Sequence, residues 1–341
     1  MLDIYLFGNG WGESILLNIE GEYSALIDCY DFGSTSLIKR KLEELNIKKL
    51  DLLAITHPHL DHFKDIYECE KQMQPTKLVT FGSDSLGTYG AYFEVLSKMA
   101  KSAEKKNALR KMSEEFQRLK SVSENFQSLQ EMLIKSAEER KHNHVKVSGH
   151  GFIDKRPSVD LEIISVLPLV SDPKLIERQL LALIRASGLT TTLSDNFAEE
   201  NNLVNGLSVG LLVSYKGNKA LFCSDSNSEN MKTLAELNAE KNNGGMLNSV
   251  GLIKISHHGS PHGNPDEFWS HLASVTTNPK LICTYYSGKL PDYKTMEKVT
   301  TVTNSSLFQP KAKYALGTTH TYRIENDHPL KISIDDKGIY I

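Results

Sequence analysis

The chain has 341 residues, of which 40% are hydrophobic and 24% are charged, and its formal net charge is −3. This composition is that of a globular protein, large enough for one domain with insertions or for two small domains. The charge excludes a strongly basic chain that binds nucleic acid over its whole surface, although a local basic patch can exist within a neutral total.

The four cysteines, Cys29, Cys69, Cys223 and Cys283, are far apart and form no CxxC pair. This spacing fits neither a disulfide framework nor a cysteine zinc site, and it favours a reducing compartment. No run of about 18 apolar residues is present, so we expect no membrane span. The first residues lack the basic and apolar regions of a signal peptide. We therefore expect a complete cytoplasmic protein.

The first 55 residues alternate between strands and turns. We predict three strands here, over residues 3–7, 14–21 and 23–30, with a glycine-rich turn after the first. A serine/threonine cap then opens a helix over residues 34–47. Residues 50–55 form a short, continuously apolar run, as expected of a buried strand. The histidine-rich segment that begins at His57 therefore starts where a buried strand ends, and such loops often carry catalytic groups.

Residues 91–144 differ from the rest of the chain, because no Gly or Pro occurs in them. Apolar residues recur at spacings of three and four, at Leu109, Met112, Phe116, Leu119, Phe126, Leu129 and Leu133. This pattern predicts one long amphipathic helix or a helical hairpin inserted into the domain. The segment could pack on its own domain, form a coiled-coil-like dimer arm or partner-binding arm, or cover the site as a lid.

The second half again alternates strands and helices. Strand-like sequence resumes at residues 159–169, and a helical segment follows over residues 173–188. Residues 207–225 predict a hairpin around the turn YKGNK. A helix over residues 228–238 leads to an apolar strand at residues 250–255, which also ends in histidines.

Residues 311–341 are predicted to be closing strands. No internal repeat or low-complexity tract marks a domain boundary. We therefore expect one α/β domain over residues 1–341, with residues 91–144 as a helical insertion within it.

Residues of the types that bind metal ions follow three of the predicted strands. They are His57, His59, Asp61 and His62 after the first, Asp225 after the second, and His257 and His258 after the third. Imidazoles and carboxylates without thiolates suit zinc first, and also manganese or iron. Alternate residues of an extended backbone point the same way, so His57 and His59 can hold one ion together.

Asp61 and His62 lie beyond the turn and can reach a second ion, and Asp225 can bridge the two. Two ions about 3.5–4 Å apart activate one water molecule and stabilise charge on the attacked group. The sequence thus predicts a dinuclear metal site.

The segment HPHLDH, residues 57–62, resembles the His-x-His-x-Asp-His signature of the metallo-β-lactamase fold superfamily. The early segment ALIDCYD, the later Asp225 and the late histidine pair occur in the order of that superfamily. Within it, the chain is most similar to the C-terminal hydrolase domain of ComEC-type competence proteins. The segments that carry this likeness are FGNGWGES, NGLSVGLLVSYKGNKALFCSD and LIKISHHGS. The resemblance spans most of residues 1–290, apart from the insertion.

The resemblance implies an αββα metallo-β-lactamase sandwich with the metal ions at one edge, between the sheets. It also implies hydrolysis of a phosphodiester by a hydroxide bound to two metal ions. The sequence departs from the superfamily pattern at two positions near the expected metal site. Asn205 stands where many members supply a third histidine to the first metal, and Ser224 replaces a glycine. The ComEC-type domain is fused to a membrane channel, so no role in DNA uptake is implied.

Roles follow for single residues. We expect His258 to be a metal ligand and His257 to be catalytic, facing the substrate, although the sequence allows the two to be exchanged. Asp61 would be a ligand that also orients the attacking water, and Ser260, like Lys64, would contact an anionic substrate. Asp28 would orient a ligand histidine.

Some histidines and one aspartate remain outside this scheme. Asp65 is expected to be a loop or helix-start carboxylate. His142, His144 and His150 are expected to be solvated, with a replacement ligand from the insertion as the alternative. His320 and His328 are expected to be structural or at the rim of the site.

We therefore expect a phosphodiesterase or nuclease with two divalent ions, zinc or else manganese, acting on a nucleotide or nucleic acid. Two alternatives remain open. One is a hydrolase of a small ester or lactone on the same metals, because a fold alone does not choose the reaction. The other is a protein that binds a partner or a second copy through residues 91–144, with a regulatory metal site.

Overall fold

The computed structural model describes residues 1–10, 12–57, 59–81, 143–147, 150–166, 205–206, 208–241, 245–286, 290–308 and 329–341. The predicted insertion lies outside these residues, except that its last two positions, Asn143 and His144, belong to a strand and not to a helix. The helix predicted at residues 173–188 and the first of the closing strands also lie outside them.

Two large sheets form the centre of the fold. The first has eight strands in the order β17-β16-β1-β3-β4-β5-β6-β7. Their bounds are Leu2–Phe7 for β1, Ser14–Ile19 for β3, Tyr23–Ile27 for β4, Leu52–Ala54 for β5, Lys77–Phe81 for β6, Asn143–Val147 for β7, Leu330–Asp335 for β16 and Gly338–Tyr340 for β17. Strand β5 pairs in parallel with both β4 and β6, so the carboxyl ends of these strands meet at one edge.

The second sheet has seven strands in the order β15-β13-β12-β11-β10-β9-β8. Their bounds are Gly151–Arg156 for β8, Leu161–Ser165 for β9, Leu211–Tyr215 for β10, Asn218–Phe222 for β11, Val250–Lys254 for β12, Lys280–Ile282 for β13 and Leu307–Phe308 for β15. Strands β10 and β11 form the hairpin predicted around the turn YKGNK. Strands β11, β12, β13 and β15 pair in parallel.

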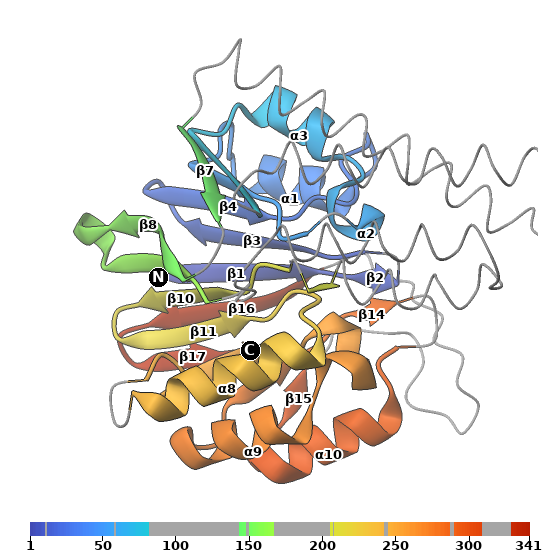
Figure 1. The fold of residues 1–341 in the computed structure, drawn as a ribbon. Helices are drawn as coiled ribbons and strands as arrows, with labels where there is room; N and C mark the ends of the chain where they lie inside the picture. Colours follow the sequence, from blue (N-terminus) through green and yellow to red (C-terminus); the bar gives the residue numbers. More distant parts are fainter. Residues whose placement is uncertain are drawn as a thin grey trace, which may run out of the picture.

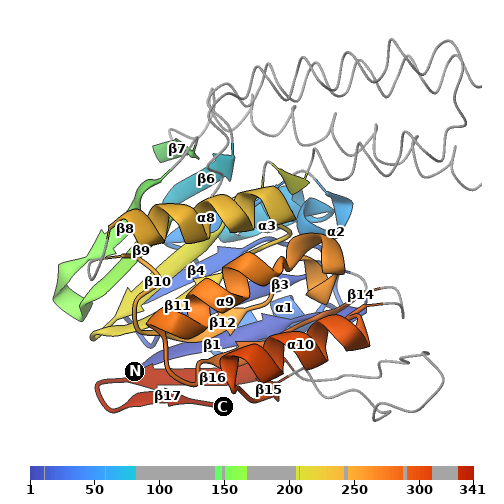
Figure 2. The same ribbon diagram turned by 60° about the horizontal axis from the view of Figure 1, so that its bottom comes forward.

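Helices cover the outer faces of both sheets (Figure 1). On the first sheet they are α1, Leu37–Glu44, α2, Leu60–Phe63, and α3, Ile66–Met73. On the second they are α8, Ser228–Glu240, α9, Asp266–Val275, and α10, Tyr293–Thr303, which run side by side in Figure 2. The predicted αββα sandwich is therefore confirmed by the order of these layers.

The continuously apolar strands are explained by burial of both faces of the second sheet. Along β10, Leu211 and Val213 belong to the core between the two sheets, whereas Leu212 belongs to the core under the outer helices. Successive side chains of a strand point to opposite faces, so a strand with two buried faces needs apolar residues at every position. Trp269 of α9 is fully buried in the outer core.

The glycine-rich first turn is joined to a late part of the chain. Strand β2, Asn9–Gly10, pairs in parallel with β14, Tyr285–Tyr286. A Cβ atom at Gly8 would lie 2.3 Å from Cγ2 of Thr284, so only glycine lets Thr284 approach this closely. Gly12 has a φ of +95° and would clash with the carbonyl of Asp61, which favours glycine there as well. The turn therefore depends on its glycines for close contact with two other segments.

Within the described residues, we find no helix that is both long and apolar enough to cross a membrane.

Candidate metal centre

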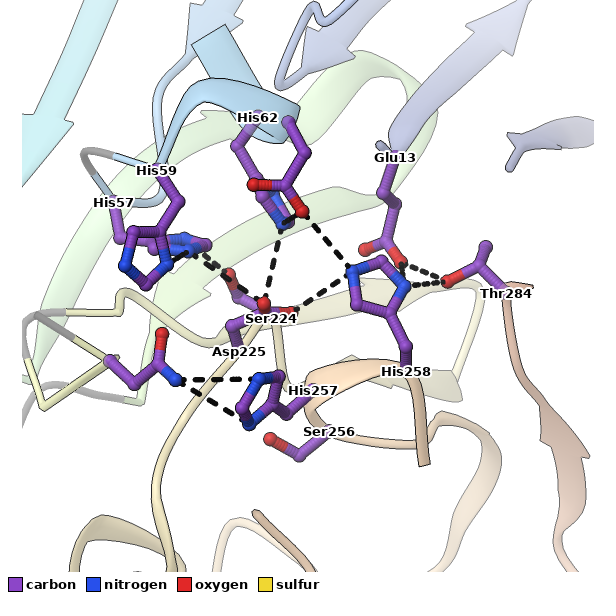
Figure 3. Close-up of polar contacts among 12 residues, drawn as sticks. Glu13, His57, His59, His62, Ser224, Asp225, Ser256, His257, His258 and Thr284 are labelled. Carbon is purple, nitrogen blue, oxygen red and sulfur yellow. Dashed lines mark hydrogen bonds and ion pairs between the residues drawn. The ribbon is translucent and has the colours of Figure 1, made fainter. Parts of the chain in front are cut away.

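The ends of three buried strands bring the predicted ligands to one place between the two sheets (Figure 3). His57 and His59 follow β5, and Asp61 and His62 lie in α2. Asp225 follows β11, and His258 lies in the short 3-10 helix η4, His257–Gly259, after β12. Strand β5 belongs to the first sheet, whereas β11 and β12 belong to the second, so both sheets contribute to the cluster.

The side chains form two groups that share one carboxylate. His57, His59 and Asp225 make up the first group. Asp61, His62, Asp225 and His258 make up the second. The ligand atoms of each group all lie within 4.8 Å of one another. The arrangement is compatible with a dinuclear metal site in which Asp225 serves both positions.

The distances centre on the two oxygens of Asp225. Its Oδ2 lies 3.8 Å from Nε2 of His57 and 3.6 Å from Nε2 of His62. Its Oδ1 lies 3.8 Å from Nε2 of His258. Oδ2 of Asp61 lies 3.8 Å from Nε2 of His62 and 3.6 Å from Nε2 of His258. These separations are too long for hydrogen bonds, so neither carboxylate bonds to these imidazole atoms, whereas Nε2 of His57 and Nδ1 of His59 lie 3.1 Å apart, within hydrogen-bond distance.

Four buried polar atoms in the cluster have no hydrogen-bond partner among the described residues: Nε2 of His59, His62 and His258, and Oδ1 of Asp225. Buried polar atoms of this kind are normally paired, because leaving one unpaired costs about 1–3 kcal/mol. Nitrogen and oxygen donors of imidazole and carboxylate are the ligands that zinc accepts. The unpaired atoms therefore fit a site for divalent metal ions.

Asp28 fixes the orientation of His62 from behind. Strand β4 ends just before Asp28, whose φ of +59° turns its side chain towards β5. Oδ1 of Asp28 accepts the backbone N–H of Thr56 at 2.8 Å. Oδ2 accepts the Thr56 hydroxyl and Nδ1–H of His62, both at 2.7 Å. Because an ionised carboxylate only accepts, His62 carries its proton on Nδ1 and directs Nε2 at the cluster.

His57 is held by two hydroxyl groups. Its Nδ1 lies 3.1 Å from Oγ1 of Thr56 and 3.3 Å from Oγ of Ser224, and Ser224 donates to Thr56 at 2.7 Å. Ser224 stands where the resemblance to metallo-β-lactamase-fold proteins predicts a glycine, and it has a φ of +50°. The serine thus keeps the left-handed turn that glycine adopts easily, and its hydroxyl supports a ligand histidine.

The protonation states favour metal binding. Burial lowers the pKa of His57 well below its ordinary value, and burial also lowers the pKa of His59 to about 4. Both imidazoles are therefore neutral near pH 7, which is the form that binds metal ions. Burial alone would raise the pKa of Asp225, but His258 and His62 hold it well below its ordinary value. Its carboxylate is therefore ionised.

His62 behaves differently from the other two histidines. Burial would lower its pKa, but the carboxylates of Asp225, Asp28 and Asp61 raise it well above 6.5. Without a metal ion, His62 is therefore protonated at neutral pH.

Metal affinity is expected to rise with pH for this reason. An ion that binds Nε2 of His62 must displace a proton, and displacement of one proton makes affinity rise by about tenfold per pH unit. The rise should continue to the raised pKa of His62 and level off above it. Competition with a chelator across a pH series measures the affinity, and calorimetry in buffers of different ionisation enthalpy counts the released protons. Uptake without proton release at neutral pH would contradict this assignment.

His257 belongs to neither of the two groups and lies next to Asn205. Both His257 and His258 have left-handed φ angles, +48° and +49°, followed by Gly259 at +76°. Left-handed residues other than glycine cost about 1–2 kcal/mol each, and backbone bonds from His257 to Ser224 and from Ser260 to His257 hold them. The turn sends the two neighbouring imidazoles in different directions.

Asn205 was predicted to stand in place of a third ligand histidine. It is buried, and its Nδ2 lies 3.4 Å from Nδ1 and 3.5 Å from Nε2 of His257. Within the described residues, the first group has two histidines and one carboxylate.

The remaining predicted residues lie around the cluster or apart from it. Ser260 is buried, and its hydroxyl accepts the backbone N–H of His262 in the short helix η5, Pro261–Gly263, so its contact with substrate stays a prediction. Asp65 precedes α3 and accepts the N–H of Phe32. His150 is exposed, and its Nδ1–H donates to the carbonyl of Ser165. His142, His320 and His328 lie outside the described residues.

Sequence reasoning missed a buried group on the opposite side of His258. Glu13 of the first turn, Lys254 at the end of β12 and Thr284 before β14 are all at most 2% exposed. Nζ of Lys254 lies 2.7 Å from Oε2 of Glu13. The one available signal was a lysine at the end of an otherwise apolar strand, where a solvated side chain is not expected.

No protein-family model matches the sequence, and no curated protein matches it. Among solved structures, the chain is similar to a diphosphatase of the PhnP family, with 11% identity, coverage of 98% of each chain and a TM-score of 0.43. It is also similar to zinc-bound PqqB from Methylobacterium extorquens, with 9% identity, coverage of 90% of this chain and 97% of that one, and a TM-score of 0.44.

A third similar structure is CmlA, a diiron β-hydroxylase from Streptomyces venezuelae, with 11% identity, coverage of 96% of this chain and 47% of that one, and a TM-score of 0.39. TM-scores this low do not establish a fold or a function for this chain. The fold therefore rests on the layers and strand order, and the function is argued from the site. None of the three is described as a ComEC-type protein, so that narrower resemblance stays a prediction.

Proposed function

We propose that the chain is a hydrolase of phosphodiesters, acting on a nucleotide or a nucleic acid with two divalent metal ions. The observation that carries the proposal is the pair of ligand groups that share Asp225 and contain four buried polar atoms without hydrogen-bond partners among the described residues. Paired metal ions in one site are typical of phosphatases and nucleases, where they stabilise the attacking and leaving oxygens together.

The chain's own residues would divide the work as follows. His57 and His59 would hold one ion, and Asp61, His62 and His258 the other, with Asp225 shared between them. Bound there, the ions would lower the pKa of a water molecule and polarise the scissile phosphoryl group. Zinc is the first choice for this donor set, with manganese second.

Two side chains are placed to handle protons and substrate. Asp61 has 18% of its side chain exposed, whereas Asp225 and the three buried ligand histidines have at most 3%. Asp61 would therefore meet solvent, and as an ionised carboxylate it would orient the attacking water by accepting a hydrogen bond from it. His257 belongs to neither ligand group but lies beside the cluster, and in this proposal it protonates the leaving group or steadies a phosphate oxygen.

The test combines metal analysis with a substrate screen on the purified protein. We expect about two equivalents of zinc or manganese, and release of nitrophenol from bis-p-nitrophenyl phosphate that a chelator abolishes and added metal restores. Single-stranded DNA, RNA and cyclic nucleotides in the same screen identify the substrate class. His150→Ala serves as a control, because this exposed histidine lies outside both groups.

Two results would overturn the proposal. One is a purified protein that takes up no transition metal under any loading condition. The other is cleavage of a lactone or simple ester with no activity on any diester, which would assign the same site to a different substrate.

A further inference from the structure

We propose that Glu13 and Thr284 are positioning residues that fix which nitrogen of His258 carries its proton, so that Nε2 is the free ligand atom. The inference deepens the proposed function, because it rests on the metal centre proposed there. It concerns Glu13 and Thr284, which lie far apart in the sequence and belong to neither group of ligand residues.

The contacts form a chain that runs outward from the ligand. Figure 3 shows His258 between Asp225 on one side and Glu13 and Thr284 on the other. Oγ1 of Thr284 lies 2.8 Å from Nδ1 of His258 and 2.5 Å from Oε2 of Glu13. All three side chains are at most 2% exposed. Solvent therefore has little access to these bonds.

The donor and acceptor in each of these two hydrogen bonds follow from the number of protons available. An ionised carboxylate can only accept hydrogen bonds, so the single hydroxyl proton of Thr284 goes to Glu13. The hydroxyl oxygen must then accept from His258, which places the imidazole proton on Nδ1. Nε2 is left with its lone pair, and it is the atom that lies 3.6 Å from Asp61 and 3.8 Å from Asp225. A carboxylate two bonds away thus sets the state of the ligand.

Lys254 keeps the Glu13 carboxylate in this accepting role. Its Nζ lies 2.7 Å from the same Oε2 atom, and an ammonium group can only donate. Two donors therefore converge on Oε2, which excludes a proton on that oxygen. Lys254 also contacts the carbonyl of Ser224 at 3.3 Å, next to Asp225.

The fold holds this chain of contacts rigidly. Pairing of β2 with β14 places Thr284 against Gly8, where no larger residue fits. The backbone N–H of Glu13 donates to the carbonyl of Asp61 at 3.0 Å, which ties the first turn to the ligand helix α2. Asp28 holds Nδ1 of His62 in the same way from the other side. Glu13 in the first turn thus orients His258 through Thr284, and Asp28 after β4 orients His62 directly.

The experiment is a cobalt titration, followed by absorption, of the wild type and three variants. Thr284→Val removes the hydroxyl while keeping the shape and leaves the Glu13–Lys254 pair intact. We expect it to weaken binding of one of the two ions by about 10–100-fold, as loss of a supporting partner does, and to leave the other unchanged. Thr284→Ser restores the hydroxyl and should restore the affinity. Thr303→Val is the matched control, since that buried hydroxyl donates to the carbonyl of Val299 in its own helix α10.

A second measurement needs no variant of Thr284. Long-range proton–nitrogen NMR of the metal-free wild type at alkaline pH, with His258→Gln for assignment, reports which ring nitrogen is protonated. We expect the proton on Nδ1. A proton on Nε2, or two unchanged affinities in a folded Thr284→Val protein, overturns the inference. A wild type that binds no metal overturns the proposed function instead, and the NMR result still decides the tautomer.

Discussion

Asp225→Asn is expected to lower diester hydrolysis by about a thousandfold or more and to strip the protein of both metal ions. The substitution keeps the shape of the side chain and removes only its charge. Oδ2 of Asp225 faces His57 and His62, and Oδ1 faces His258, so the change weakens both groups at once. Metal-ion stabilisation is worth several kcal/mol in a transition state, and each 1.4 kcal/mol is about a factor of ten in rate.

The measurement is metal content and diester hydrolysis on the same preparation, with circular dichroism to confirm the fold. Asp154→Asn is the matched control, because Asp154 is a buried carboxylate of β8 paired with Lys77 at 2.8 Å and belongs to neither ligand group. The control should lose stability but retain its metal. An Asp225→Asn protein that keeps two tightly bound ions would show that Asp225 is not shared.

Lys254→Met is expected to lower the free energy of unfolding by about 3–5 kcal/mol, because it leaves the buried Glu13 carboxylate without its cation. Lys254 is 0% exposed and Glu13 is 2% exposed, so water cannot replace the lost partner. Methionine fills a similar volume without charge. The loss is a large part of the roughly 5–15 kcal/mol that stabilises a typical domain.

Urea unfolding of metal-free protein measures this effect apart from metal binding. The double variant Glu13→Gln/Lys254→Met, which replaces the ion pair by two neutral side chains, should recover most of the lost stability. A cost below about 1 kcal/mol for Lys254→Met, as for an exposed ion pair, would refute the view that the two charges depend on each other. Equal costs for the single and double variants would refute it as well.

The sequence was most informative where one local pattern determines both structure and chemistry. The apolar run before His57 predicted β5, and the run before Asp225 predicted β11 with its hairpin. Because these strands are buried on both faces, their residues could not be mistaken for a surface strand. The ligands stand at the strand ends, so knowing the strands was enough to bring the ligands together.

Contacts between distant segments were not predictable in this way. Nothing in the sequence near Glu13 indicates that Thr284 lies beside it, since the link is the pairing of two strands of two residues each. Strands that short carry no periodic pattern. Helices α3 and α9 were also not predicted, and α3 is only eight residues long. The direction in which His257 points depends on left-handed backbone angles at two non-glycine residues, which propensity does not favour.

The place of β1 in its sheet bears on how the chain reaches its native state. β1 lies between β3 and β16, and Ser333 donates to Asp3 at 2.6 Å across a separation of 330 residues. One edge of β1 therefore stays without its native partner until β16 has left the ribosome. Contacts of such long sequence separation close slowly, and an open strand edge promotes aggregation in the meantime. Folding of this sheet is consequently completed only once β16 is available, and the edge of β1 that β16 covers is open until then.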